Sequence, residues 1–196
     1  MVDYLMYIEK YIEDEKKVLD MLDRNEINRA LNLLEECLKN DSNIYIFGNG
    51  GSSATASHFV NDFNKGISEN TKKKFRFQCL NDNIPTVMAI ANDIGFDEIF
   101  RFQLNERITD KDVIIAISGS GNSKNVINAV EYAKSVGCKI IGLTGFIGGK
   151  LKELSDISLH APINSMQITE DIHMFFDHLM MSIFYKTMCN KEHING

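Results

Sequence analysis

Two stretches decide the fold of this chain: residues 44–58, IYIFGNGGSSATASH, and residues 113–125, VIIAISGSGNSKN. Each begins with an apolar run, passes through small and turn-forming residues, and continues as a stretch with helical spacing. Short apolar runs that alternate with such stretches predict βαβ units, in which helices cover both faces of a parallel sheet. Five runs fit this pattern, at residues 44–47, 75–80, 113–117, 139–143 and 157–160.

The first forty residues differ from this alternation. Apolar residues recur there at helical spacing, beginning with Leu5 and Ile8, and again after a polar break at residues 23–25. We therefore predict an α/β fold, a three-layer parallel five-stranded sheet with an N-terminal helical pair. Because the sequence has no linker and no internal repeat, we expect one domain, with the helices over residues 1–40 and the α/β core over residues 41–196.

The composition is that of an ordinary globular domain, with 44% hydrophobic and 24% charged residues in a chain of 196. The net charge of −6 argues against a nucleic-acid partner, because domains that bind the phosphate backbone usually carry a basic excess. No apolar run approaches the roughly 20 residues of a membrane span, and the N-terminus is too acidic for a signal peptide. The four cysteines lack CxxC spacing, which is typical of buried, reduced thiols. We therefore expect a cytoplasmic protein without nucleic-acid or membrane partners.

The last helix is predicted over residues 167–188 and is rich in large apolar side chains such as Phe175, Phe176 and Leu179. Together with the N-terminal pair, it offers more apolar surface than a single domain of this kind needs to cover its core. Burial of this surface against other copies of the chain would avoid a large exposed patch. A homo-oligomer is therefore expected.

The first glycine-rich loop, residues 48–53 (GNGGSS), follows the first expected strand and leads into a helix. Ligands of open α/β sheets bind at the carboxyl ends of the strands, so this loop is a candidate binding site. Glycines let the backbone approach a ligand, and a helix N-terminus favours negative charge. A dinucleotide site is the obvious alternative. It fits poorly, because Ser53 replaces the third glycine of that fingerprint and the run FRFQCL at residues 75–80 ends without an acidic residue.

The second loop, residues 118–123 (SGSGNS), follows the third expected strand and again enters a helix. Three hydroxyls, a flexible backbone and the start of a helix suit a dianionic phosphate, because the donors converge without a lysine. The GK[ST] element of a Walker loop is absent from the sequence here. A tight turn rich in small residues is the alternative, and a second loop of the same kind makes that alternative less attractive.

Two of the expected helices carry histidine and carboxylate pairs. His58 and Asp62 are four residues apart and share a helix face. Glu170 and His178 are eight residues apart, about 80° around the helix axis. Each pair alone is typical of an ordinary surface ion pair. Together they supply two imidazoles and two carboxylates, a set suited to zinc or to acid–base catalysis.

A family resemblance runs through nearly the whole chain. It is carried by FGNGGSSATASHFVNDF at residues 47–63, NDIGFDEIF at 92–100, ISGSGNSKNVINA at 117–129, IIGLTGFIGGKL at 140–151 and the EDIH helix from residue 170. These segments resemble the sugar isomerase (SIS) domain superfamily. Within it they are most similar to the bacterial sedoheptulose 7-phosphate isomerases, also called phosphoheptose isomerases.

The resemblance implies a homotetramer of flavodoxin-like domains with active sites between subunits. The implied substrate is a phosphorylated ketoheptose, sedoheptulose 7-phosphate. It would be isomerised to D-glycero-D-manno-heptose 7-phosphate for the heptose of lipopolysaccharide or capsule. Zn²⁺ is the implied cofactor.

The resemblance also implies roles for individual residues. The sugar would contact Asn49, Gly50, Gly51 and Ser52, with Asn92 and Asp93 beside it. The phosphate would be held by Ser118, Gly119, Ser120 and Ser123. The metal ligands would be His58, Asp62, Glu170 and His178. Asp62 or Glu170, both also in reach of the substrate, would act as the catalytic base, with His178 as the acid–base partner.

The chain departs from the family pattern at four positions. Asp62 stands where the family usually has glutamate, and Glu170 stands where it has glutamine. Gly119 replaces a threonine of the phosphate loop. Gly66 replaces an arginine, with Lys65 adjacent.

Two non-catalytic functions are the alternatives. One is a regulatory SIS-domain protein of the kind that binds the bacterial replication initiator. The other is a sugar-phosphate sensor that binds its ligand without turnover. The two histidines and two carboxylates favour an isomerase, because a scaffold has no need of them.

Overall fold

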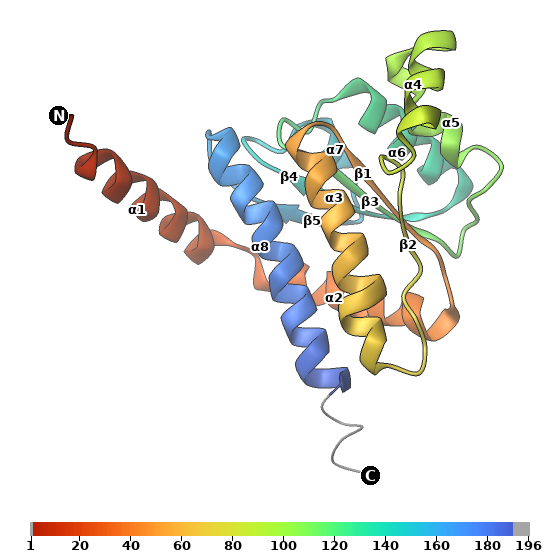
Figure 1. The fold of residues 1–196 in the computed structure, drawn as a ribbon, viewed down its shortest axis with the longest axis horizontal. Helices are drawn as coiled ribbons and strands as arrows, with labels where there is room; N and C mark the ends of the chain where they lie inside the picture. The colour runs from red at the N-terminus through yellow and green to blue at the C-terminus, as the bar shows by residue number, and fades with distance from the viewer. Residues whose placement is uncertain (1, 190–196) are drawn as a thin grey trace.

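A computed structural model describes residues 2–189 of the chain (Figure 1). Its five strands are parallel and form one sheet in the order β2-β1-β3-β4-β5. The strands are β1 (Ile44–Gly48), β2 (Phe77–Cys79), β3 (Val113–Ser118), β4 (Lys139–Thr144) and β5 (Ile157–His160). The predicted fold is confirmed, and the strand order is that of flavodoxin-like proteins.

Helices pack on both faces of the sheet (Figure 1). Buried side chains of α2, α3 and α8 share one core with the strands, and those of α4, α5, α6 and α7 share the other. The helices are α1 (Leu5–Met21), α2 (Arg24–Asn40), α3 (Gly51–Asn61), α4 (Ile84–Asp93), α5 (Arg101–Leu104), α6 (Lys124–Val136), α7 (Gly149–Leu154) and α8 (Met166–Phe184).

The central strands divide their side chains between the two cores, as a period of two requires. Ile44 and Ile46 of β1 face the layer of α2, α3 and α8, whereas Tyr45 and Phe47 face the opposite layer. Every residue of β1 and β3 is buried. This burial on both faces explains why the sequence of these strands is a continuous apolar run.

The N-terminal helical pair is present. Asp23 caps α2 by accepting hydrogen bonds from the backbone N–H groups of Asn25 and Glu26, which separates α2 from α1. The first helix projects from the body of the molecule (Figure 1). Tyr11 of α1 donates a hydrogen bond to Asp171 of α8. Most α1 side chains are exposed, including large apolar ones.

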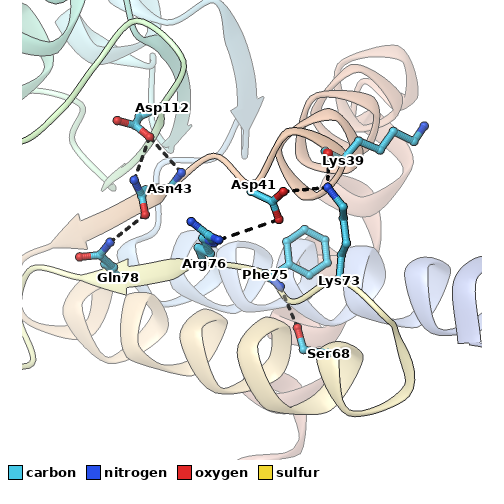
Figure 2. A network of polar contacts seen from close by, with 9 residues as sticks. All are labelled: Lys39, Asp41, Asn43, Ser68, Lys73, Phe75, Arg76, Gln78 and Asp112. Atoms are coloured by element: carbon cyan, nitrogen blue, oxygen red, sulfur yellow. Dashed lines mark hydrogen bonds and ion pairs between the residues drawn. The ribbon is translucent and has the colours of Figure 1, made fainter.

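Two elements differ from their predicted bounds. The run at residues 75–80 forms only the short edge strand β2, because the Phe75 backbone N–H donates to the Ser68 hydroxyl and not to a strand (Figure 2). The last helix is α-helical to Phe184 and continues as a π-helical turn over Tyr185–Cys189.

A polar network holds the amino ends of the strands (Figure 2). Asp112 accepts hydrogen bonds from the backbone and side-chain N–H groups of Asn43, and Asn43 accepts one from Gln78. Beside them, Lys73 pairs with Asp41 at 2.8 Å. These contacts tie β1, β2 and β3 together at the amino edge of the sheet. The glycine-rich loops lie at the opposite, carboxyl edge, because each follows the end of a strand.

Cys37, Cys79 and Cys138 are free thiols, as expected. Burial raises the pKa of Cys37 to about 12 and that of Cys138 to about 11, so these thiols stay protonated and unreactive at neutral pH. Among the helices of residues 2–189, none combines the length and the apolar character that crossing a bilayer requires.

Candidate active site

The carboxyl ends of β1 and β3 lie side by side at the point where the strand order reverses. Ligands of open α/β sheets bind at this switch point. The two glycine-rich loops follow these two strands. The side-chain amides of Asn49 and Asn125 exchange two hydrogen bonds of 2.9 Å, which join the first loop to the first turn of α6. The two loops are thereby held as one site.

The loop after β1 enters α3 at Gly50. Its φ of +55° is a backbone conformation that favours glycine. Ser53 donates its hydroxyl to the Gly50 carbonyl, and Ser52 is buried beneath the loop. The Ser53 and Ala54 N–H groups donate to the Gly50 carbonyl. The Gly51 and Ser52 N–H groups come before this first intrahelical bond, so they are the ones available to an oxygen of a bound sugar.

The loop after β3 gathers three hydroxyls around the start of α6. The Ser118 and Ser123 oxygens are 3.1 Å apart, and Ser120 accepts a hydrogen bond from the Asn122 backbone N–H. The hydrogen bond from the Gly121 N–H to the Ser118 carbonyl closes this loop into a turn. Because α6 begins directly after Ser123, the loop has the donors and the helix dipole that suit a phosphate.

The first turns of α8 pack over the ends of three strands. At each end a glycine leaves room for an α8 side chain, which occupies the space where a Cβ would lie. A larger residue at any of these positions would displace α8 from the site. We call these three contacts the glycine contacts of α8: Glu170 on Gly51, Met166 on Gly119 and Thr169 on Gly145.

His58, Asp62, Asp177 and His178 form one group between α3 and α8, which we call the His–Asp cluster. Each residue offers one nitrogen or oxygen atom, and these atoms all lie within 4.8 Å of one another. His58 Nε2 is 3.1 Å from His178 Nε2, 3.5 Å from Asp62 Oδ2 and 3.9 Å from Asp177 Oδ2. Two imidazoles with carboxylates are ligands that zinc prefers. The His–Asp cluster could therefore hold a metal ion.

The two carboxyl groups of the cluster have different surroundings. Asp62 begins a π-helical turn, Asp62–Ile67, and accepts a hydrogen bond from the Asn61 side chain. Asp177 has a side chain that is 0% exposed, and within the described chain neither of its oxygens meets a hydrogen-bond donor. Burial, and after it the charge of Asp62, raises the pKa of Asp177 to about 8.

The structure brings together three of the four predicted metal ligands. His58, Asp62 and His178 are members of the His–Asp cluster, whereas Glu170 is not. Glu170 lies against Gly51. Gly51 comes seven residues before His58 on α3, and Glu170 comes eight residues before His178 on α8. At 1.5 Å per residue, this spacing puts Glu170 about 10–12 Å from the cluster. Its role as a ligand is therefore not supported by the geometry of a single chain.

Asp177 is the site residue that the sequence analysis missed. One signal could have revealed it, because Asp177 is the lone acidic residue in the apolar stretch 172–184. An acidic residue at such a position needs either a partner or a proton. Its partners lie on α3, however, and only the packing of α3 against α8 identifies them.

Three further positions, two predicted beside the sugar and one that departs from the family pattern, have local explanations. Asn92 and Asp93, predicted beside the sugar, are exposed at the end of α4 and hydrogen-bond to each other at 2.7 Å. In residues 2–189, neither side chain forms a hydrogen bond to the loops after β1 and β3. Gly66, where the family has arginine, lies against Met181, which a larger side chain would have to displace.

His173, the other histidine of α8, belongs to the core. It is 1% exposed, and among the residues described no donor or acceptor reaches its ring nitrogens. The ring lies near the Thr144 backbone and His160. Burial lowers the pKa of His173 to about 4, so the ring is neutral at physiological pH.

The polar residues of the candidate site are gathered at the carboxyl edge of the sheet. A cavity of about 600 Å³ lies at the amino edge, where Cys37, Asp112 and Lys139 are part of its lining. The predicted site residues do not line it. The amino-edge cavity is therefore separate from the candidate active site.

Comparison with known proteins identifies the family. Residues 7–145 match the model of the SIS domain family. The phosphoheptose isomerase of Aliarcobacter butzleri is 38% identical over 167 residues, which cover 85% of this chain and 87% of that protein. The phosphoheptose isomerase of Helicobacter pylori strain P12 is 35% identical over 194 residues, 98% of this chain and 100% of that protein. The solved structure of phosphoheptose isomerase from Neisseria gonorrhoeae superposes with a TM-score of 0.83 at 30% identity, over 93% of this chain and 96% of that chain. The chain therefore belongs to the SIS domain family and, within it, to the phosphoheptose isomerases.

Proposed function

We propose that this isomerase converts sedoheptulose 7-phosphate to D-glycero-D-manno-heptose 7-phosphate. The observation that carries the proposal is the pair of loops at the switch point. A serine-rich loop at the start of α6 is joined by the Asn49–Asn125 amide pair to a glycine-rich loop at the start of α3. Glu170 lies over the glycine-rich loop, at Gly51. The arrangement suits a ligand with a phosphate at one end and a chain of hydroxyls and a carbonyl at the other.

The phosphate binds at Ser118, Ser120 and Ser123 in this proposal. Hydrogen bonds to a charged acceptor contribute roughly 1.5–3 kcal/mol each, so a few donors hold the dianion without a lysine. Gly119 lacks the hydroxyl that a threonine would add, and Met166 fills the space beside it. The backbone N–H groups of the first turn of α6 supply further donors.

The reaction moves a proton from the carbon next to the ketose carbonyl to the carbonyl carbon itself, through a cis-enediol. A base is needed on one face of those carbons, together with a group that moves protons between the oxygens. Glu170 is the better placed of the two candidate bases, because it lies beside Gly51 of the sugar loop. Asp62 faces His58 instead, at 3.5 Å. His178 is the candidate acid–base partner. Because Glu170 and His178 of one chain are about 10–12 Å apart along α8, this pairing requires the two side chains to come from different subunits.

We further propose Zn²⁺ at the His–Asp cluster, held by His58, Asp62 and His178. The donor set fits, because nitrogen and carboxylate oxygen are both common zinc ligands and the three side chains converge. When bound, zinc polarises a carbonyl as a Lewis acid. His58 Nε2 and His178 Nε2 already face each other across 3.1 Å, so both rings are oriented toward a shared point.

The resemblance also supports a homotetramer with active sites between subunits, in the cytoplasm, making heptose for lipopolysaccharide or capsule. The exposed apolar side chains of α1, such as Leu5, Ile8 and Ile12, support self-association.

The test is to incubate the purified protein with a panel of ketose phosphates in deuterated water. We expect an aldose phosphate from the seven-carbon substrate, with deuterium on the carbon beside the carbonyl. Glu170→Ala, Asp62→Asn and His178→Ala should each lower turnover by roughly 10²–10⁴, the usual contribution of a positioned proton-transfer group. Binding of the phosphosugar without turnover by the wild-type protein would make it a sensor instead.

A further inference from the structure

We propose that Asp177 is a metal ligand, so that the His–Asp cluster holds a divalent cation with two imidazoles and two carboxylates. The inference rests on the metal site of the proposed function and adds a residue to it. Asp177 lies on α8, directly before His178. The other two members of the cluster are His58 of α3 and Asp62, which begins the π-helical turn that follows α3.

The distances within the cluster suit four ligands around one ion. Nitrogens bound to one tetrahedral zinc lie about 3.3 Å apart, given zinc–nitrogen bonds of about 2.0–2.1 Å. The two histidine nitrogens are 3.1 Å apart. The carboxylate oxygens of Asp62 and Asp177 are 3.5 and 3.9 Å from His58 Nε2. All four ligand atoms lie within 4.8 Å of one another.

The burial of Asp177 gives independent support. Its side chain is 0% exposed, and in residues 2–189 no hydrogen-bond donor reaches either oxygen. A buried carboxylate without such a partner is costly, because it loses its hydration and gains nothing in return. A hydrophobic residue at this position would carry no such cost. A bound cation removes the cost, since it supplies the missing charge and bonds to the oxygens.

Asp177 is also better placed than Glu170. Glu170 is engaged at the other end of the helix pair, about two turns away, in a glycine contact with Gly51. Asp62 has one oxygen occupied by the Asn61 side chain, which leaves the other for the cluster. A second carboxylate at position 177 therefore completes a set of four.

The ligand types indicate which cations fit. Two neutral imidazoles and two carboxylates carry a charge of −2, which a dication neutralises. Magnesium and calcium prefer oxygen ligands alone, whereas zinc accepts nitrogen and oxygen together. We therefore expect zinc to bind more tightly than magnesium or calcium.

The test measures zinc binding to chelator-treated full-length protein by calorimetry, without sugar. We expect Asp177→Asn to weaken zinc affinity by more than about 100-fold, beyond the 10–100-fold that loss of an outer-shell partner costs. Asp171→Asn, the same substitution at an exposed position of the same helix, is the matched control and should bind zinc within threefold of the wild type. Because no substrate is present, failure of the isomerase assay leaves this result unaffected.

A melting experiment separates a ligand from a structural residue. Without metal, Asp177→Asn should melt at or above the wild-type temperature, because it removes a buried unpartnered carboxyl. Zinc should then raise its melting temperature less than it raises that of the wild type. Asp177→Leu provides a second variant if the first does not fold. The proposal is overturned if wild-type protein does not bind zinc, or if both Asp177 variants bind it within threefold of the wild type.

Discussion

At the scale of single residues, the two facing imidazoles of the His–Asp cluster restrict their own protonation. His58 Nε2 and His178 Nε2 are 3.1 Å apart, so only one of them can carry a hydrogen that points at the other. The remaining lone pair accepts that hydrogen. A metal ion would replace the shared hydrogen and bind both lone pairs. The neutral form that ligation requires is thus compatible with the geometry already present.

The serines of the second loop provide a prediction about ligand binding. Ser118→Ala, Ser120→Ala and Ser123→Ala should each weaken phosphosugar binding at least several-fold, because each removes a donor to a dianion. Calorimetric titration with sedoheptulose 7-phosphate measures the change. Ser135→Ala is the control, since that serine donates its hydroxyl to the Tyr132 carbonyl in the last turn of α6, away from the loop. Unchanged affinity in all three loop variants would exclude this loop as the phosphate site.

His173 provides a prediction about pH. Its pKa is lowered to about 4 in the folded protein, against about 6.5 when unfolded. The unfolded state therefore binds a proton that the folded state does not, and stability falls as the pH drops from 6.5 toward 4. At pH 5 the protonation of His173 in the unfolded state lowers the free energy of unfolding by about 2 kcal/mol.

Urea unfolding of wild-type protein and His173→Phe at pH 7.5 and pH 5 measures that effect. Other groups titrate equally in both proteins, so the difference between their pH-dependent losses isolates His173. We expect the variant to lose about 2 kcal/mol less than the wild type on acidification. Equal losses in the two proteins would mean that His173 is not held neutral by burial.

At the scale of elements, α8 determines the shape of the site. Its first turns fill the three glycine positions at the strand ends, and its middle supplies Asp177 and His178. The loop after β3 is fixed from the other side by α7, because Gly121 lies directly against the Gly148 carbonyl. The Leu151 backbone N–H also donates to the Gly121 carbonyl. The site is therefore built from contacts between elements far apart in the sequence.

Gly121 provides a prediction about stability. Its φ is +67°, and a Cβ there would overlap the Gly148 carbonyl oxygen. Gly121→Ala should cost more than about 2 kcal/mol, the backbone strain plus the overlap. For a chain of this size, that lowers the melting temperature by about 5 °C or more.

Gly137→Ala is the matched control for this substitution. Gly137 also has a positive φ, +100°, but its neighbour is the Asp110 side chain at 3.3 Å. We expect it to cost only about 1 kcal/mol, the penalty of the conformation alone. If the two variants melt at the same temperature, the close approach of the loop after β3 to α7 does not contribute.

Local patterns made most of the elements predictable. Central strands such as β3 are buried on both faces, so their sequence is apolar throughout and their bounds follow directly. The edge strand β2 is shorter than its apolar run, because Phe75 bonds to a side chain outside the sheet. That contact links residues seven apart in a loop, and no periodicity reveals it.

The candidate site also has a part that local spacing predicts and a part that depends on packing between distant elements. His58 and Asp62 share one helix turn, so their spacing alone predicts that they meet. Asp177 joins them only because α8 packs beside α3, and the Asn49–Asn125 pair forms only because β1 and β3 are neighbours. These contacts depend on the order of strands and helices, which a single sequence does not display.

At the scale of the whole molecule, α1 is the part that the domain itself leaves uncovered. It projects from the body of the molecule (Figure 1). The exposed side chains of Leu5, Ile8 and Ile12 share one face of this helix by their spacing. In solution, such a face is usually buried against another copy of the chain. Light scattering of the wild-type protein should therefore give about four times the mass of one chain.

Substitutions on the two faces of α1 test this assembly. Ile8→Glu with Ile12→Glu should produce smaller species, because both charges would have to be buried in the interface. Glu13→Gln with Lys17→Gln removes an exposed ion pair of the same helix and should leave the mass unchanged. A wild-type protein that is monomeric at micromolar concentration would contradict the assembly.

The parallel course of α3 and α8 has a consequence for how this chain can change in length. The two helices touch at Gly51 with Glu170, and again at His58 with His178, after intervals of seven and eight residues. These two contacts hold the helices in one fixed register. One residue inserted between Glu170 and Asp177 would leave the helix intact but turn every later side chain by about 100°. Asp177 would then face away from α3 although no residue had been lost. The number of residues between the two contacts on each helix is thus under a stricter constraint than the identity of the side chains between them.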